Sequence, residues 1–175
     1  MRLFVSLNLP EDPLTVLSAV QDRLPGDLRR VPEENLHLTM AFLGDVSEDL
    51  AQAAHEGLET IRAPKVDLAL TGATVYGGRH GQALALEAEG EAPLHELHDR
   101  IRARLRGAGV TLERRRFRPH VTLARLPGRV DPGPALAALC TAHVPSFSAH
   151  SFSLIQSTLH DAGAIYEPLA TYPLG

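Results

Sequence analysis

One seven-residue pattern occurs twice in the chain, and this repeat constrains the fold more than any other feature. The two copies are Asn35–Ala41 and Arg118–Ala124, which read NLHLTMA and RPHVTLA. Each position of the first copy lies 83 residues before its counterpart in the second (37 + 83 = 120). Apolar and polar residues alternate around a His-x-Thr core, as in a strand with one buried face. We therefore expect two equivalent strands, one in each of two similar halves.

The rest of the chain alternates between strand and helix patterns. Period-two alternation predicts strands over residues 2–9, 36–43, 66–70, around 75, 83–88, 117–126, 152–159 and 165–172. Helical spacing of apolar residues predicts helices over residues 13–24, 47–61, 94–105 and 132–142, the second of them with Ser47 as N-cap. The strands read as half-exposed, which favours antiparallel sheets in an α+β fold.

Length, charge and cysteine content narrow the class of protein. The 175 residues suit a single domain or two small fused lobes, and we expect one unit over residues 1–175. A net charge of −4 argues against a broad basic surface for nucleic acid. Cys140 is the single cysteine, which excludes an internal disulfide, and we expect it to be buried. The start is too polar for a signal peptide and no run reaches the ~20 apolar residues of a membrane span, so we expect a cytoplasmic protein.

The spacing within each motif places two polar side chains together. Residues i and i+2 of a strand share a face, so His37 lies with Thr39, and His120 with Thr122. The other face of the first strand is expected to pack against a helix; it carries Leu36, Leu38, Met40 and Phe42. Two such strands side by side bring two imidazoles and two hydroxyls into one cleft.

This set of groups suits the chemistry of a phosphodiester. An imidazole with a pKa near ~6.5 can be neutral in one copy and protonated in the other at physiological pH. The neutral ring can accept a proton from water, and the protonated ring can donate one to the leaving oxygen. Threonine hydroxyls can donate hydrogen bonds to phosphate oxygens. The scheme needs no metal ion and no cofactor.

The residues around both motifs are similar to those of a known family. The chain resembles the 2H phosphoesterases, and among them the bacterial and archaeal RNA 2′,3′-cyclic phosphodiesterases, also called 2′-5′ RNA ligases. The resemblance runs nearly end to end and rests on Arg2–Val5, Pro32–Thr39, Phe42–Gly44, Phe117–Arg125, Ser157–Leu159, Tyr166, Glu167 and Leu169. Relatives often carry a tryptophan before the Val-Pro that precedes the first motif, whereas this chain has Arg30 and no tryptophan.

The resemblance implies a fold, a reaction and roles for the motif residues. The fold would be two pseudo-symmetric lobes, each an antiparallel sheet with helices on the outside, around a central cleft. The reaction would be hydrolysis of an RNA 2′,3′-cyclic phosphate end to a 2′-phosphate, with reversible ATP-independent 2′-5′ ligation as a side activity. His37 would be the proton donor and His120 the proton acceptor, while Thr39 and Thr122 hold the phosphate.

Several residues outside the motifs have weaker functional interpretations. Arg125 is the preferred anion contact because relatives resemble the chain there, although strict alternation places Arg118, the second candidate, on the histidine face and Arg125 on the other; a bulge could redirect it. Base-stacking rings, in the absence of tryptophan, could be Phe4, Tyr76 or Phe117. The pair His95 and His98 lies on a predicted helix without a metal-site spacing, so we expect both on an exposed face.

Three functions remain open from the sequence, while a fourth, a metal-dependent hydrolase, lacks an obvious third ligand beside the two histidines. The first is the metal-independent RNA cyclic phosphodiesterase, working as a monomer because both motifs lie on one chain. The second is the same chemistry on another small cyclic phosphate, since the motif recognises phosphate and not base. The third is an RNA- or nucleotide-binding module that has lost turnover, although both complete motifs argue against it.

Overall fold

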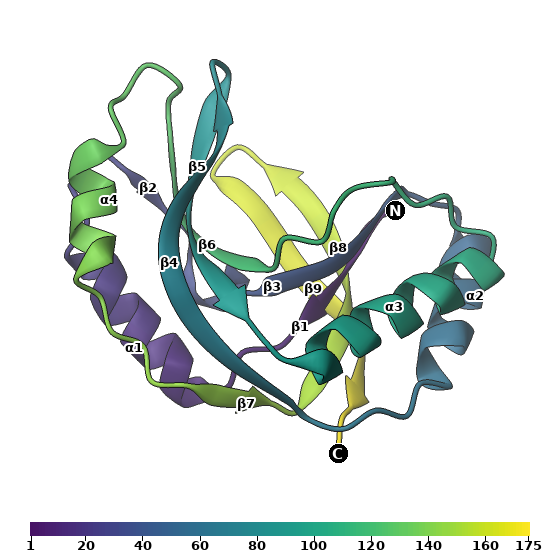
Figure 1. The fold of residues 1–175 in the computed structure, drawn as a ribbon. Helices are drawn as coiled ribbons and strands as arrows, with labels where there is room; N and C mark the ends of the chain where they lie inside the picture. Colours follow the sequence, from purple (N-terminus) through teal and green to yellow (C-terminus); the bar gives the residue numbers. More distant parts are fainter.

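The computed structural model describes residues 1–175 and contains nine strands and four α-helices (Figure 1). The strands are β1 (Arg2–Leu7), β2 (Arg29–Arg30), β3 (Leu38–Asp45), β4 (Val66–Gly78), β5 (Gly81–Glu89), β6 (His120–Leu126), β7 (Phe147–Ala149), β8 (Ser151–His160) and β9 (Gly163–Pro173). The helices are α1 (Glu11–Asp22), α2 (Glu48–Glu59), α3 (Ala92–Gly107) and α4 (Gly133–Cys140), with a short 3₁₀ helix η1 (Glu33–Asn35) before the first motif. The predicted α+β class is confirmed.

The strands form an antiparallel arrangement in the order β7-β4-β5-β6-β3-β1-β8-β9, with β2 also paired to β6. Two separate sheets were expected, but the hydrogen-bonded path is continuous. The link between its halves is small, because β3 and β6 pair only at Leu38 and Val121. These two residues are equivalent positions of the repeat (38 + 83 = 121), so the duplicated strands meet each other at the middle of the sheet.

The first strand of the chain pairs with the C-terminal hairpin. The yellow C-terminal hairpin β8–β9 lies beside the purple β1 in Figure 1, and Ser6 of β1 faces Ser153 of β8 in the register. The hairpin closes with His160 opposite Gly163, whose φ of 128° lies in the region that favours glycine. Both ends of the sequence therefore build the half that carries the first motif.

The helices divide between the two halves of the sheet. Figure 1 shows α1 and α4 together at one end of the sheet, and α2 and α3 together at the other. The spacing that predicted α3 is confirmed, since all four of its leucine and isoleucine side chains are fully buried: Leu94, Leu97, Ile101 and Leu105. The predicted cap of α2 is also present, because the Leu50 amide donates to the Ser47 hydroxyl at 3.2 Å. A single apolar core of 40 buried residues joins these helices to the sheet.

A β-bulge interrupts the first motif strand. The pairing of β3 with β1 sets Val5 opposite Ala41 and Ser6 opposite Thr39, so that Met40 has no partner of its own. An extra residue on one strand shifts the alternation of the residues that follow it.

The second motif strand has the same bulge at the equivalent position. Here β5 sets Leu84 opposite Ala124 and Ala85 opposite Thr122, which leaves Leu123 without a partner (40 + 83 = 123). The repeat therefore extends from sequence to backbone conformation.

Several details differ from the sequence predictions. His37 precedes its strand and His120 begins the other, so residues 117–119 are irregular and not strand. A single long strand, β4, replaces the two expected over residues 66–75, and the short β2, β7 and η1 have too few residues to show a period. Cys140 is exposed, because α4 buries Ala135 and Leu139 on its other side. None of the helices combines the length and the apolar character needed to cross a membrane.

Candidate active site

The two motif histidines are held in the same way by the backbone. His37 Nδ1 lies 2.6 Å from the carbonyl oxygen of Asn35, and His120 Nδ1 lies 2.6 Å from the carbonyl oxygen of Arg118. A carbonyl only accepts, so each Nδ1 carries the hydrogen and donates it. In the neutral ring, Nε2 then has a free lone pair. Both imidazoles thus present an acceptor at Nε2 and become donors there when protonated.

Each motif threonine lies on the same face of its strand as the histidine, as predicted, but only one touches its histidine. The Thr39 hydroxyl donates to His37 Nε2 at 2.9 Å. Thr122 is half-buried and makes no such bond to His120. The first hydroxyl must exchange partner when a ligand enters, whereas the second is free to bind one directly.

Two aromatic rings pack against His37. The ring of Phe4 lies 4.9 Å from it and the ring of Tyr166 lies edge-on at 5.4 Å. Burial is the main cause that lowers the pKa of His37 below its usual range; the bond to the Asn35 carbonyl opposes this, and the positive charges of His120 and Arg125 add to the lowering. These surroundings therefore favour a neutral His37.

His120 stands in a different environment. Its ring stacks on Tyr76 with a centroid distance of 4.3 Å and an interplanar angle of 29°. Glu87 is its direct partner on β5. Its Nδ1 bond to the Arg118 carbonyl is the one polar contact that holds the ring.

The bulge in β6 brings Arg125 to the face of the second motif. Arg125 is opposite Ala83 and Thr122 is opposite Ala85, and these two alanines share one face of β5. The exposed guanidinium is therefore on the same side as Thr122, close enough to act on the pKa of His37. Strict alternation predicted the opposite face, and the bulge is the reason for the difference.

The bulge in β3 has the same effect on Phe42, the equivalent of Arg125 (42 + 83 = 125). Phe42 is opposite Phe4 and Thr39 is opposite Ser6, so Phe42 shares the face of Thr39. Its ring is 66% exposed. The expectation that Phe42 packs with Leu38 and Met40 under a helix is therefore wrong. A bulge has no direct sequence signal. The arginine at the equivalent position of the second motif is a residue type that is seldom buried, and this could have suggested that Phe42 is exposed as well.

Arg118 is turned to a neighbouring cluster. Its guanidinium lies 3.8 Å from the carboxylate of Glu87 and 4.7 Å from the ring centre of Tyr76. Arg118 and Arg125 thus have different surroundings: the first has an anionic and an aromatic partner, and the second has no ion pair.

A cavity of about 290 Å³ opens beside His37. A row of hydroxyls runs from Thr39 across successive strands in register through Ser6, Ser153 and Thr171, and the last three of these residues line the cavity. Asn8 links part of this row, donating to the Ser153 hydroxyl at 2.8 Å. The hydroxyls of Ser153 and Thr171 bond to each other at 2.9 Å, and the Ser6 hydroxyl donates to Asn8 Oδ1 at 3.5 Å, so these groups form a connected polar surface next to the first motif.

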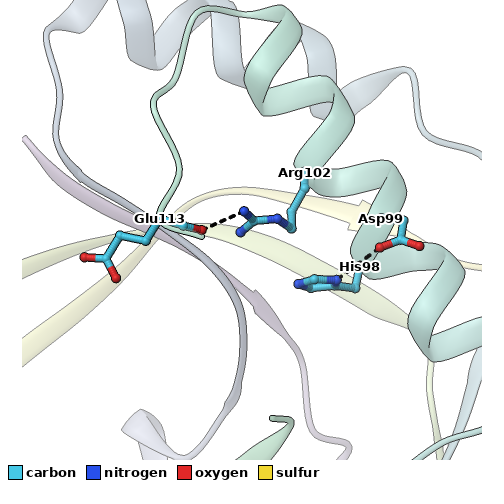
Figure 2. Close-up of polar contacts among 4 residues, drawn as sticks. All are labelled: His98, Asp99, Arg102 and Glu113. Carbon is cyan, nitrogen blue, oxygen red and sulfur yellow. Dashed lines mark hydrogen bonds and ion pairs between the residues drawn. The ribbon is translucent and has the colours of Figure 1, made fainter. Parts of the chain in front are cut away.

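The segment before the second motif is attached to α3. Phe117 stacks on His98 at 3.8 Å, so His98 is half-buried and not on an exposed face as expected. Figure 2 shows His98 beside Asp99, and Arg102 donating to the Glu113 carbonyl at 2.8 Å. Burial is the main cause that lowers the pKa of His98, opposed by Asp99. No three His, Cys, Asp or Glu side chains are grouped as metal ligands.

The predicted stacking rings have other partners. Phe4 lies against His37, Tyr76 against His120 and Phe117 against His98. Among the large side chains on the site face, Phe42 is the exposed aromatic ring.

The fold and the paired His-x-Thr strands define a LigT-like α+β protein. The structure of LigT from Escherichia coli in apo form superposes with a TM-score of 0.76 at 26% identity, covering 99% of this chain and 96% of that one. The same protein complexed with 3′-AMP gives 0.73 at 26% identity over 99% and 96%. An RNA 2′,3′-cyclic phosphodiesterase of Aeropyrum pernix is 32% identical over 148 residues, 81% of this chain and 84% of that protein. The model of the 2′-5′ RNA ligase superfamily matches residues 10–161, and the chain belongs to that family.

Proposed function

We propose that the protein hydrolyses RNA ends that carry a 2′,3′-cyclic phosphate, leaving a 2′-phosphate. Family membership supports the reaction class, and the relative from Aeropyrum pernix has this activity as its name. The observation that carries the proposal is the identical tethering of His37 and His120, which makes Nε2 the reactive nitrogen of both rings. Two imidazoles prepared in this way form an acid–base pair on opposite sides of a phosphate.

The roles of the two histidines follow from a single in-line displacement. His120 Nε2 accepts a proton from the attacking water, and the water oxygen bonds to phosphorus. The bond from phosphorus to the 3′-oxygen breaks, and His37 Nε2–H protonates that oxygen. The product retains its phosphate on the 2′-oxygen.

His37 must change from the neutral to the protonated form before it can act as an acid. Burial lowers the pKa of His37, so binding must bring in a compensating charge. The anionic phosphodiester supplies it, because a negative charge next to an imidazole favours the protonated form. Thr39 then turns its hydroxyl from the ring to a phosphate oxygen. Substrate binding and protonation of the acid are thereby coupled.

The remaining groups bind the substrate around the phosphorus. Thr122 donates to a second non-bridging oxygen, and Arg125 places its guanidinium near the developing charge. Phe42 offers an exposed ring for a base on the same face as Thr39. Arg118 is a second cation at the edge of this site. No step requires a metal ion or a cofactor.

The two equivalent bulged strands that meet at Leu38 and Val121 support a pseudo-twofold arrangement of the molecule. The two halves act as lobes of one unit over residues 1–175, with the site between them. Both histidines lie on one chain, so a monomer is sufficient for the reaction. Ligation is the same displacement with the 5′-hydroxyl of a second RNA in place of water, and it needs no further group.

The test is incubation of the protein in EDTA with an RNA oligonucleotide that ends in a 2′,3′-cyclic phosphate. We expect a 2′-phosphate product, loss of turnover in His37→Ala and in His120→Ala, and full turnover in His143→Ala, a histidine outside both motifs. A 3′-phosphate product would reverse the assignment of the leaving oxygen. Cleavage of small cyclic nucleotides alone would favour a non-RNA substrate, and binding without any turnover would favour the silent module.

A further inference from the structure

The rings of the two motif histidines are not supported equally. His37 is held at both nitrogens, by the Asn35 carbonyl and the Thr39 hydroxyl, and two aromatic rings pack against it. His120 is held at Nδ1 alone. A single hydrogen bond permits a ring to tilt about it, so some other contact must set the direction of His120 Nε2.

Tyr76 is positioned to make that contact. It lies on β4 opposite Ala83, and β5 separates it from the strand of His120. The β5 residues on this face between them are the small Ala83 and Ala85. A tyrosine can reach across two alanines, and its ring stacks nearly parallel on His120 at 4.3 Å.

Arg118 connects the two rings. Its carbonyl accepts the Nδ1 hydrogen of His120, while its guanidinium lies 4.7 Å over the ring of Tyr76. The Glu87 carboxylate, 3.8 Å from that guanidinium, also stands directly opposite His120 in the sheet. One residue therefore sets the imidazole by its backbone and the tyrosine by its side chain.

The ring of Tyr76, and not its hydroxyl, is the functional part. The hydroxyl oxygen is buried without a hydrogen-bond partner. Burial is the main cause that raises the pKa of Tyr76, with Arg118 opposing and Glu87 adding to it, so the phenol stays protonated at neutral pH. A shielded neutral phenol neither takes the proton of the water nor binds the phosphate.

We propose that Tyr76 is a positioning residue that orients His120 Nε2 by ring stacking, with Arg118 securing the stack. The inference rests on the proposed function for its effect on rate, since an oriented Nε2 matters only where His120 accepts a proton. The position of the ring itself is independent of turnover. When His120 takes up a proton, the face of Tyr76 also attracts the resulting imidazolium.

The test compares Tyr76→Leu with Tyr76→Phe. Phenylalanine keeps the aromatic face and removes a hydroxyl that has no partner, so it is the matched control. We expect Tyr76→Leu to lower kcat by about 10- to 100-fold, the loss typical of a misplaced reacting group, with KM unchanged because the substitution changes the direction of His120 Nε2 and removes no accessible hydrogen-bonding group. Tyr76→Phe should retain the wild-type kcat.

A spectroscopic measurement separates this inference from the proposed reaction. Long-range ¹H–¹⁵N correlation spectra, with the His120 signals assigned from His120→Gln, report which ring nitrogen carries the hydrogen. We expect the Nδ1–H tautomer in the wild type and in Tyr76→Phe, and a mixture in Tyr76→Leu. An inactive protein can still be examined in this way, so failure of the reaction leaves the stack testable.

Three results would overturn the inference. The first is a wild-type kcat in Tyr76→Leu. The second is a loss of kcat in Tyr76→Phe as large as that in Tyr76→Leu, and the third is an unchanged His120 tautomer in Tyr76→Leu. Should the leucine variant fail to fold, Arg118→Gln removes the guanidinium and keeps the carbonyl. We then expect a smaller change of the same sign in kcat and in the tautomer, and no change in either would also reject the proposal.

Discussion

Thr39→Val and Thr122→Val are a matched pair, because the two hydroxyls have equivalent positions in the repeat but different partners. Thr39 donates to His37 Nε2 at 2.9 Å, whereas Thr122 makes no bond to its histidine. Valine replaces a hydroxyl by a methyl group of similar size. In the protein alone, Thr39→Val therefore removes a hydrogen bond and Thr122→Val removes none. In the substrate complex, each variant removes one hydrogen bond to the phosphate.

The magnitudes follow from those contacts. In Thr39→Val the half-buried Nε2 of His37 loses its donor, which should lower the free energy of unfolding by about 1–2 kcal/mol. Thr122→Val breaks no hydrogen bond, so it should change the free energy of unfolding by no more than about 0.5 kcal/mol. Towards substrate, each variant loses a hydrogen bond to a charged oxygen worth about 1.5–3 kcal/mol, which corresponds to about 10- to 150-fold in kcat/KM.

Two assays test the pair. Denaturant unfolding at neutral pH gives the stabilities, and hydrolysis of an RNA with a 2′,3′-cyclic phosphate gives kcat/KM. Serine at each position is the control, since it keeps the hydroxyl. Equal destabilisation by both valine variants would contradict the difference between the bonded Thr39 hydroxyl and the unbonded Thr122 hydroxyl. Wild-type kcat/KM in either variant would refute phosphate binding by that threonine.

Two further predictions concern charge. Burial lowers the pKa of His37 and of His98, so below about pH 6.5 the unfolded chain binds protons that the folded chain does not. The free energy of unfolding, measured by denaturant titration, should therefore fall as the pH is lowered from about 7 towards about 5, and His98→Gln should reduce this pH dependence. A free energy of unfolding that does not change with pH would be inconsistent with neutral buried rings. Arg125→Gln should reduce kcat/KM by about 10-fold or more and weaken its dependence on salt, measured against Arg129→Gln as a nearby control; equal effects of the two variants would show that only bulk charge matters.

The sequence was sufficient for the elements with a clear period. The alternation around His37 and His120, the apolar spacing of α3 and the cap at Ser47 each predicted what the structure contains. Short or irregular elements were missed, since β2, β7 and η1 have too few residues to show a period. Cys140 was misplaced because an apolar run on a short helix does not reveal which side faces the core.

The site shows the same division at the level of single residues. Spacing placed each histidine with its threonine, because residues i and i+2 of a strand share a face. The same rule failed for Phe42 and Arg125, which follow an unpaired residue in each strand. A bulge depends on how two strands pair, and strand pairing joins segments that are distant in sequence.

The sequence by itself determined the duplicated motif, the kinds of chemical group in the site and the membership of the superfamily. Local pattern carries these properties, since residue type and spacing are enough to define them. Tertiary structure alone decided that the two copies meet at one residue pair, that His37 packs against two aromatic rings while His120 stacks on Tyr76, and that Arg125 faces the site. These depend on side chains from different strands, and only packing brings such side chains together.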